Sequence, residues 1–253
     1  MAQKRTDQIL EILQQQGYVT VKYLCEELHY STATINRDLN DLQRQKLIVR
    51  HYGGAELAAK KGVPLVFRYH KMRSVKQAIS KRAATFIQEG MTVFIDGSTT
   101  AQYMAGYIQT VKDLTVITNN LNLVTHLSEA GVRCISLGGA IVEPPYVAGG
   151  DDAAAQASTY TADIAFFSVG GISAEGLIYD GAGYYGLHRA MLARSKKSVL
   201  LVDHEKIGIE NKRVLCDFSK VNTVISDFDF SDSVQHDFPN TEFMLVESGK
   251  NKQ

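Results

Sequence analysis

The chain has 253 residues, with 27 Lys and Arg against 27 Asp and Glu and with 45% hydrophobic residues. At roughly 150 residues per domain, this length predicts one large domain or a small domain plus a larger one, and the ordinary apolar content excludes wholesale disorder. No stretch approaches the roughly 20 consecutive apolar residues of a membrane helix, and the charged start MAQKRTDQILEIL is unlike a signal peptide. We therefore expect a soluble protein of the cytoplasm.

The cysteines and histidines are sparse and scattered. Cys25, Cys134 and Cys216 form no CxxC pair, and the seven histidines form no HExxH motif and no cluster at metal-ligand spacing. A disulfide framework and a zinc site are therefore not expected. The chain also has no GxxxxGK[ST] phosphate loop and no well-placed GxGxxG, which disfavours an ATPase or a nicotinamide enzyme. We expect no metal and no cofactor.

The zero net charge conceals an asymmetry between the two ends. Residues 1–73 contain twelve basic and seven acidic residues, a net charge of +5, and the remainder carries −5. A basic end on an acidic body fits a two-part protein whose smaller part meets a polyanion. Runs of charge are, however, also common on ordinary solvated faces.

The first helical patterns lie in residues 6–45. Apolar positions recur at helical spacing from Thr6 until Gly17, and Thr20 can cap a second short helix. Ser31 can cap a third helix, STATINRDLNDLQRQ, which has one apolar stripe along its length. Two helices joined by a four-residue connection are the ingredients of a helix-turn-helix. The segment LIVRHYGGAEL then alternates before a Gly-Gly turn, which predicts the β-hairpin wing of a winged helix.

The polar side chains of the third helix and the hairpin suit DNA. Short polar residues at the start of the helix can approach base edges, and the arginines can reach phosphates or a guanine. The candidate DNA-binding residues are Ser31, Thr32, Thr34, Asn36, Arg37, Asn40, Arg44, Arg50 and His51. The same pattern also fits a three-helix dimerisation or docking module with an incidental arginine face.

Residues 58–73, AAKKGVPLVFRYHKMR, combine a Lys pair, a Gly and a Pro with an apolar patch. This composition predicts a linker that packs in part. It either transmits a signal between the two parts or is a plain tether.

Helix and strand patterns alternate from residue 74 onward. A helix is predicted over 76–88, followed by the strand MTVFI, the helix TTAQYMAGYI, the strand LTVIT, the helix LNLVTHLSEAG and the strand CISLGGAIV. Further strands are DIAFFSVGGI, SVLLVD and TVISD, with a helix near 186–194. Continuous apolar strands separated by helices predict a mostly parallel sheet covered on both faces. Such sheets bind ligands at the carboxyl ends of their strands.

Small, polar and glycine-rich turns follow several of these strands. DGSTT, at a predicted helix start, offers backbone N–H groups and the positive end of a helix dipole, which favour a phosphate, and Lys206 is a candidate cation. The candidate effector-binding residues are Asp96, Gly97, Ser98, Thr99, Thr100, Asn119, Asn120, Gly138, Gly139, Gly170, Asp203 and Lys206. Turns of this kind also occur simply to fit a tight bend and to cap a helix.

The run TINRDLNDLQRQKLIVRHYGGA, preceded by GYVTVKYLCEELHYSTA, resembles the winged-helix signature of the DeoR family of bacterial transcriptional regulators. One position departs from that signature, because Asn36 stands where the family usually has the first Arg of an Arg-Arg pair. If the missing Arg contacts phosphate, overall affinity for DNA is lower. If it reads a base, the operator sequence differs.

The stretches IDGSTT, VITNN, LGG, SVGGIS and LVDHEKIG are similar to the effector module of that family, whose fold is similar to ribose-5-phosphate isomerase. The resemblance implies a phosphorylated sugar or sugar metabolite, with its phosphate on Gly97–Thr100, its sugar near Asp96, Asn119, Asn120 and Gly139, and Lys206 close by. Where many members carry a Glu shortly before Lys-Arg-Ala-Met, this chain has Tyr184 to Met191, with His188 before Arg-Ala-Met. The stretch EPPYVAGGD is either a lid or a surface loop.

The predicted fold class is α/β, with an N-terminal winged helix-turn-helix (1–57) joined by a linker (58–73) to a mostly parallel-sheet, isomerase-like α/β effector domain (74–253). The predicted function is a non-enzymatic repressor of a carbohydrate operon, which binds double-stranded operator DNA under the control of a phosphorylated sugar. We expect dimers or tetramers, because one winged helix rarely gives enough affinity alone. The alternatives are a phosphosugar isomerase, with Asp96, Asp203 and Lys206 as reacting groups, and a scaffold whose head contacts protein.

Overall fold

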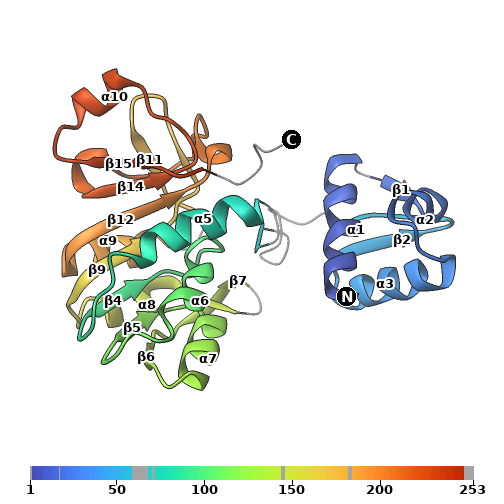
Figure 1. Cartoon of the computed structure of the whole chain (residues 1–253), viewed down its shortest axis with the longest axis horizontal. Helices are drawn as coiled ribbons and strands as arrows, with labels where there is room; N and C mark the ends of the chain where they lie inside the picture. The colour runs from blue at the N-terminus through green and yellow to red at the C-terminus, as the bar shows by residue number, and fades with distance from the viewer. Residues whose placement is uncertain are drawn as a thin grey trace. The chain divides into compact units, whose positions relative to one another are not determined.

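The computed structural model describes residues 2–16, 18–58, 68–69, 72–143, 146–181 and 184–247. The chain divides into two compact units, Met1–Lys71 and Met72–Gln253 (Figure 1). Most of the predicted linker, 58–73, lies outside the described residues. Within the described ranges no helix is long and apolar enough to cross a membrane.

The N-terminal unit is a winged helix, as predicted. Its helices are α1 (Ala2–Gln16), α2 (Val21–Leu28) and α3 (Thr32–Arg44), and its antiparallel sheet has the order β1 (Tyr18–Thr20), β3 (Gly54–Leu57), β2 (Ile48–His51). Both predicted caps are confirmed: the hydroxyl of Thr20 accepts from the N–H of Tyr23 at 3.1 Å, and that of Ser31 accepts from the N–H of Thr34 at 3.3 Å. Sequence analysis missed β1, because three residues are too few to show a period.

A buried ion pair joins α1 to α3 in this unit. The guanidinium of Arg5 donates two hydrogen bonds to the carboxylate of Asp38, one of them at 3.0 Å, and lies over the ring of Tyr30 at 4.6 Å. The hydrogen bonds that Arg5 donates to Asp38 raise the pKa of Arg5, against the opposing effect of burial. The Asp38 side chain is only 3% exposed, and among the described residues Arg5 is the cation that compensates its charge.

Replacing Arg5 with Ala should lower the free energy of unfolding of the N-terminal unit by about 2 kcal/mol, because it leaves a buried carboxylate without its partner. Chemical denaturation of the full chain, followed by a probe placed in this unit, measures the change. Arg44→Ala is the matched control, since the Arg44–Asp41 pair is largely exposed and its loss should cost at most about 0.5 kcal/mol. Equal losses in the two variants would contradict a structural role for the buried pair.

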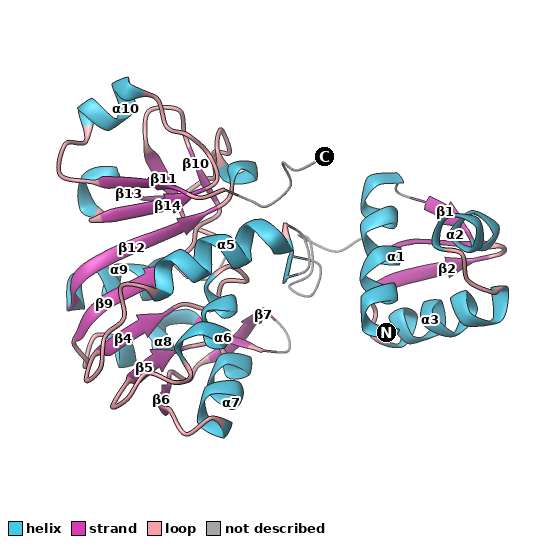
Figure 2. Cartoon of the chain, viewed as in Figure 1, coloured by secondary structure: helices cyan, strands magenta, loops and turns pink. Residues whose placement is uncertain are grey.

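The C-terminal unit is built on a seven-stranded parallel sheet (Figure 2), which confirms the predicted fold class. Across the sheet the strands are β15 (Glu242–Leu245), β14 (Thr223–Ser226), β12 (Ser195–Val202), β9 (Ala162–Phe167), β4 (Thr92–Ile95), β5 (Thr115–Thr118) and β6 (Arg133–Ser136). Because all seven run the same way, the turns after β4, β5, β6, β9 and β12 share one edge.

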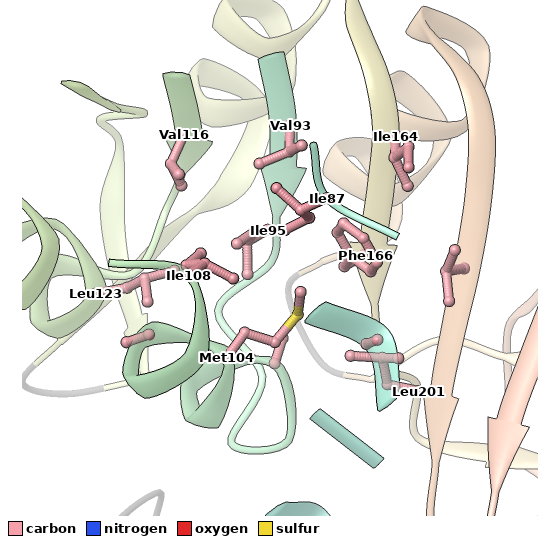
Figure 3. Close-up of a cluster of buried hydrophobic side chains, with 14 of the residues drawn as sticks. Ile87, Val93, Ile95, Met104, Ile108, Val116, Leu123, Ile164, Phe166 and Leu201 are labelled. Carbon is pink, nitrogen blue, oxygen red and sulfur yellow. The ribbon is translucent and has the colours of Figure 1, made fainter. Parts of the chain in front are cut away.

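Helices cover both faces of this sheet. One face packs against α5 (Arg73–Ala84), the 3-10 turn η1 (Ala101–Met104), α6 (Ala105–Ile108) and α7 (Leu121–Glu129). Figure 3 shows the core between them, with Met104 and Ile108 facing Ile95 and Phe166 of the sheet. From the other face α9 (Tyr185–Arg194) contacts β9 and β12, and α8 (Gly150–Ala157) packs on α9 (Figure 2). A sheet covered in this way explains the near-continuous apolar strands.

Several predicted elements differ in detail. The helix predicted over 76–88 begins three residues earlier as α5, and the one predicted from TTAQYMAGYI is η1 followed by the single-turn α6. CISLGGAIV is two strands, β6 and β7 (Ala140–Glu143), because Gly139 turns the chain at φ 130°. DIAFFSVGGI likewise divides into β9 and β10 (Gly171–Ile172).

A second, small sheet has the antiparallel order β10, β11 (Leu177–Tyr179), β13 (Val214–Asp217). It was not predicted, because its strands are short and its outer residues Leu177 and Val214 are exposed. The remaining unpredicted elements are β8 (Val147–Gly149), α8, the 3-10 turns η2 (His204–Lys206) and η3 (Phe218–Lys220), α10 (Asp232–Asp237) and β15.

Candidate DNA-binding and effector-binding sites

The outer face of α3 carries most of the predicted DNA-binding residues. Its buried residues are Ile35, Asp38, Leu39 and Leu42, which leaves Arg37, Asn40 and Arg44 exposed on the opposite side. Arg37 has no hydrogen-bond or ion-pair partner among the described residues, whereas Arg44 pairs with Asp41. Ser31, Thr32 and Thr34 lie at the exposed or half-buried start of the helix, where Ser31 acts as its cap.

The β2–β3 hairpin, called the wing below, contacts α3, called the recognition helix below, through the side chain of Arg50. Its two terminal nitrogens donate to the side-chain oxygens of Asn40 at 2.6 Å and Asn36 at 2.5 Å. The amide nitrogen of Asn36 donates in turn to the carbonyl of Thr32 at 2.9 Å. His51, further along the same strand, is exposed and bonds Glu56 at 2.9 Å. The structure therefore brings Asn36, Asn40 and Arg50 into one cluster, while Arg37 and His51 stand apart from it.

At the carboxyl edge of the large sheet, the centre of the predicted effector site is a buried carboxylate network. One oxygen of Asp96 accepts from the N–H of Ser98 at 3.1 Å, and the other accepts from the N–H of Ser168 at 2.9 Å and from Nε2 of His188 at 3.1 Å. Nδ1 of His188 lies 2.8 Å from the carboxylate of Asp180. Asp96 and His188 are each 1% exposed. Asp96 thus orders the loop after β4 and the turn after β9, and both its oxygens are used by the protein.

His188 is held in its charged form by this network. Burial alone lowers the pKa of an imidazole, but the hydrogen bonds to Asp180 and Asp96 outweigh burial and raise the pKa of His188 to about 9. Its ring stacks on Tyr184 with centroids 5.5 Å apart and planes 11° from parallel. Tyr184 and His188 therefore form one ordered assembly with Asp96 and Asp180.

The loop predicted to hold a phosphate, Gly97–Thr100, is fixed by α5. Nζ of Lys76 donates to the hydroxyl of Thr99 at 3.1 Å, and one helical turn later the hydroxyl of Ser80 donates to the carbonyl of Thr100 at 2.6 Å. Lys76 is 5% exposed. Sequence analysis missed it, because a lone Lys on a helix is usually solvated.

Asn119 and Asn120 follow β5, and the structure gives them different surroundings. The side-chain oxygen of Asn120 caps α7 by accepting from two backbone N–H groups at 3.0 and 3.2 Å, so it serves the fold. Asn119 donates its amide to the carbonyl of Ala148 at 2.6 Å, and its side-chain oxygen is buried with no hydrogen-bond partner in the described part of the chain. A buried oxygen of this kind is available to a ligand hydroxyl.

The glycine-rich turn after β6 contains Gly138 and Gly139, which contact residues of α8 and of the end of β8. The N–H of Gly138 donates to the side-chain oxygen of Gln156 at 3.0 Å. Gly139 adopts φ 130°, and a Cβ there would collide with the carbonyl of Gly149. Gly139 therefore has a structural reason to be glycine, separate from any ligand, whereas any residue but proline at position 138 could donate to Gln156.

Asp203 lies at the end of β12, close to two cations. It is 3% exposed, and one of its carboxylate oxygens has no hydrogen-bond partner within the described ranges. Burial raises the pKa of Asp203, and the nearby charges of Lys76 and Lys206 oppose that shift. Gly170, after β9, packs instead against Asp180 and Asn211.

The segment EPPYVAGGD is part of the domain and not a plain surface loop. Val147–Gly149 is the buried strand β8, whose Ala148 donates its N–H to the carbonyl of Asn119 at 3.0 Å. Gly150 begins α8. Residues 144–145 lie outside the described ranges.

The N-terminal unit is a winged helix with an exposed arginine on α3. The C-terminal unit is a parallel-sheet domain with buried acceptors and a lysine at its carboxyl edge. This combination is typical of a DNA-binding regulator with a sensor domain. The family described as "DeoR-like helix-turn-helix domain" matches residues 5–61, and that described as "DeoR C terminal sensor domain" matches residues 71–228. The chain belongs to the DeoR family of transcriptional regulators.

Individual relatives agree with this assignment. The chain is 32% identical to the "Glycerol-3-phosphate regulon repressor" of Escherichia coli (strain K12) over 228 residues, which are 88% of this chain and 90% of that protein. It is 31% identical to the "HTH-type transcriptional repressor GlcR" of Bacillus subtilis (strain 168), over 89% of this chain and 88% of that protein. Among solved structures it is similar to ribose 5-phosphate isomerase from Plasmodium falciparum, with 16% identity, a TM-score of 0.41 and coverage of 54% and 53% of the two chains.

Proposed function

We propose that this protein is a repressor that binds operator DNA through α3 and the wing, and that a phosphorylated sugar or related metabolite bound at the carboxyl edge of the large sheet controls that binding. The first half rests on the exposed polar face of α3, where Arg37 has no ion-pair partner among the described residues. Two relatives that are at least 30% identical over most of their length are named as repressors, which supports repression. We also propose a dimer or tetramer, since paired heads match paired half-sites.

The effector half of the proposal rests on the groups that converge on the loop Gly97–Thr100. Lys76 supplies a cation at Thr99, and Asp203 and Asn119 each have a buried oxygen that accepts no hydrogen bond from the described residues. A cation with loop N–H groups suits a phosphate, and unpaired acceptors suit sugar hydroxyls. Because α5 begins at Arg73, directly after the boundary between the two units, a ligand that contacts Lys76 acts on the helix nearest the DNA-binding unit in sequence.

The enzyme alternative is less well supported at Asp96 than at Asp203, whose buried carboxylate has one oxygen without a hydrogen-bond partner among the described residues. An isomerase needs a general base free to take a proton from its substrate. Asp96 is the acceptor of three hydrogen bonds within the protein, and His188 is charged and enclosed between two carboxylates. An aldose–ketose isomerase assay with pentose and hexose phosphates tests this alternative, and turnover without DNA binding would reverse the order of the two proposals.

The first experiment is fluorescence anisotropy of the full chain with a duplex from upstream of its own gene, beside a scrambled duplex of the same length and composition. We expect tighter binding to the upstream duplex and a steep loss of affinity as salt increases, because bound phosphates release counterions. Equal, salt-insensitive binding to both duplexes would contradict DNA recognition and favour the protein-contact alternative.

Replacing Arg37 with Ala should cost about 1 to 3 kcal/mol of binding to that upstream duplex, since a single arginine contact to a base or phosphate has this value. The same anisotropy titration measures it. Lys22→Ala is the control: Lys22 is an exposed cation on α2 that pairs with Glu26 at 3.9 Å, and its loss should change affinity by less than about twofold. Identical affinities for Arg37→Ala and the unmodified chain would refute the role given to Arg37.

A further inference from the structure

Two side-chain amides hold Arg50 of the wing against the recognition helix. Asn36 and Asn40 lie one turn apart on α3, and their oxygens accept from the two different terminal nitrogens of the guanidinium, at 2.5 and 2.6 Å. Residues at this spacing lie side by side on a helix, so together they fit the planar fork of an arginine. The hydrogen bond from Asn36 to the carbonyl of Thr32 fixes the orientation of the first amide.

Arg50 differs from two other arginines of this unit, because its partners Asn36 and Asn40 carry no charge. Arg5 and Arg44 of this unit are paired with carboxylates, which offset their charge. An amide orients a guanidinium without offsetting its charge, so the attraction of Arg50 for a phosphate is retained. Two of its five N–H groups are used, and three remain for a phosphate or a guanine.

We propose that Asn36 and Asn40 are positioning residues that preorder Arg50 for DNA, and that Arg50, rather than Asn36, makes the DNA contact at this point. This inference rests on the proposed DNA-binding function. It accounts for the position where the chain departs from the family signature: Asn36 supplies the acceptor that Arg50 needs, whereas an arginine there would place a second cation beside it. A side chain already fixed loses less freedom on binding, so its contact is stronger.

A double-mutant cycle tests the coupling. Asn36→Ala, Arg50→Ala and the double variant are titrated as full chains against the upstream duplex. Arg50→Ala should weaken binding at least about tenfold and reduce the salt slope by the equivalent of about one phosphate. Asn36→Ala should weaken binding about fivefold by loss of preordering, but should have almost no further effect in the Arg50→Ala background. Thermal unfolding of each variant reports on the fold of the unit.

The matched control places Asn36→Ala in an Arg37→Ala background. Among the described residues no hydrogen bond joins the side chains of Arg37 and Asn36, so there the two losses should multiply. If the losses of affinity in Asn36→Ala and Arg50→Ala also multiply in their double variant, Asn36 acts independently of Arg50 and the inference is overturned. If the unmodified chain binds neither the upstream nor the scrambled duplex, the proposed function fails and the inference fails with it.

A readout without DNA separates these two failures. The guanidinium N–H resonances of Arg50 in the free protein should report slower rotation in the unmodified chain than in Asn36→Ala, which keeps only the hydrogen bond to Asn40. Identical resonances in both would overturn the positioning role even where DNA binding is observed.

Discussion

Replacing His188 with Gln should remove most of the pH dependence of stability of the C-terminal unit between pH 6.5 and about 9. The pKa of His188 is raised from 6.5 to about 9 in the folded chain, because the hydrogen bonds that it donates to Asp180 and Asp96 outweigh burial. A group with a raised folded pKa stabilises fully below its unfolded pKa, and that stabilisation is lost as the pH rises through the folded pKa. The difference corresponds to about 3 kcal/mol, present at pH 6 and absent above pH 10.

Urea denaturation of the full chain at a series of pH values, followed by a probe in the C-terminal unit, measures this dependence. Because the neutral Gln leaves two buried carboxylates without a cation, a second variant protects the test against loss of folding: His188→Lys keeps a cation there throughout this pH range. The matched control is His236→Gln on the exposed helix α10, which leaves the His188 network intact. A slope in His188→Lys as steep as in the unmodified chain would show that another group titrates.

The same network contains a contact of Asp96 that the sequence does not show. The resemblance to the effector module implies a sugar near Asp96. In the structure the carboxylate of Asp96 also accepts a hydrogen bond from His188, 92 positions away, which no local pattern reveals. The Tyr and His residues between 184 and 188 were recognised as unusual, but their departure from the family pattern does not show that they stack and bond to Asp180 and Asp96.

Local signals, by contrast, predicted the winged helix and most of the large sheet. Thr20 and Ser31 cap helices through neighbours three residues away, and the stripe of α3 follows from a period of 3.6 residues. Strands such as β4 and β12 are apolar throughout because both faces are covered. Short strands like β8 and β11 lack such a signal, and their positions depend on tertiary pairing.

Replacing Lys76 with Met should weaken the response to the effector about 100-fold, because a buried charge-assisted hydrogen bond to a phosphate contributes about 1.5 to 3 kcal/mol. Lys76 is buried at the loop Gly97–Thr100, on the same helix face as Ser80, and its charge also acts on Asp203. Affinity for the upstream duplex without effector should be unchanged, since the side chain lies outside the DNA-binding unit. The measurement is release of bound duplex as glycerol 3-phosphate, ribose 5-phosphate or glucose 6-phosphate is added.

Lys81→Met is the matched control, because Lys81 is an exposed lysine on the same helix and its loss changes the net charge equally. Its variant should respond to the effector as the unmodified chain does. Thr99→Val refines the test: it removes the hydroxyl that accepts from Lys76 but leaves the cation, so its loss of response should be smaller than that of Lys76→Met. If both Lys76→Met and Thr99→Val released DNA at unmodified effector concentrations, the effector would have to bind away from this loop. The buried oxygens of Asp203 and Asn119 would then require a purely structural explanation.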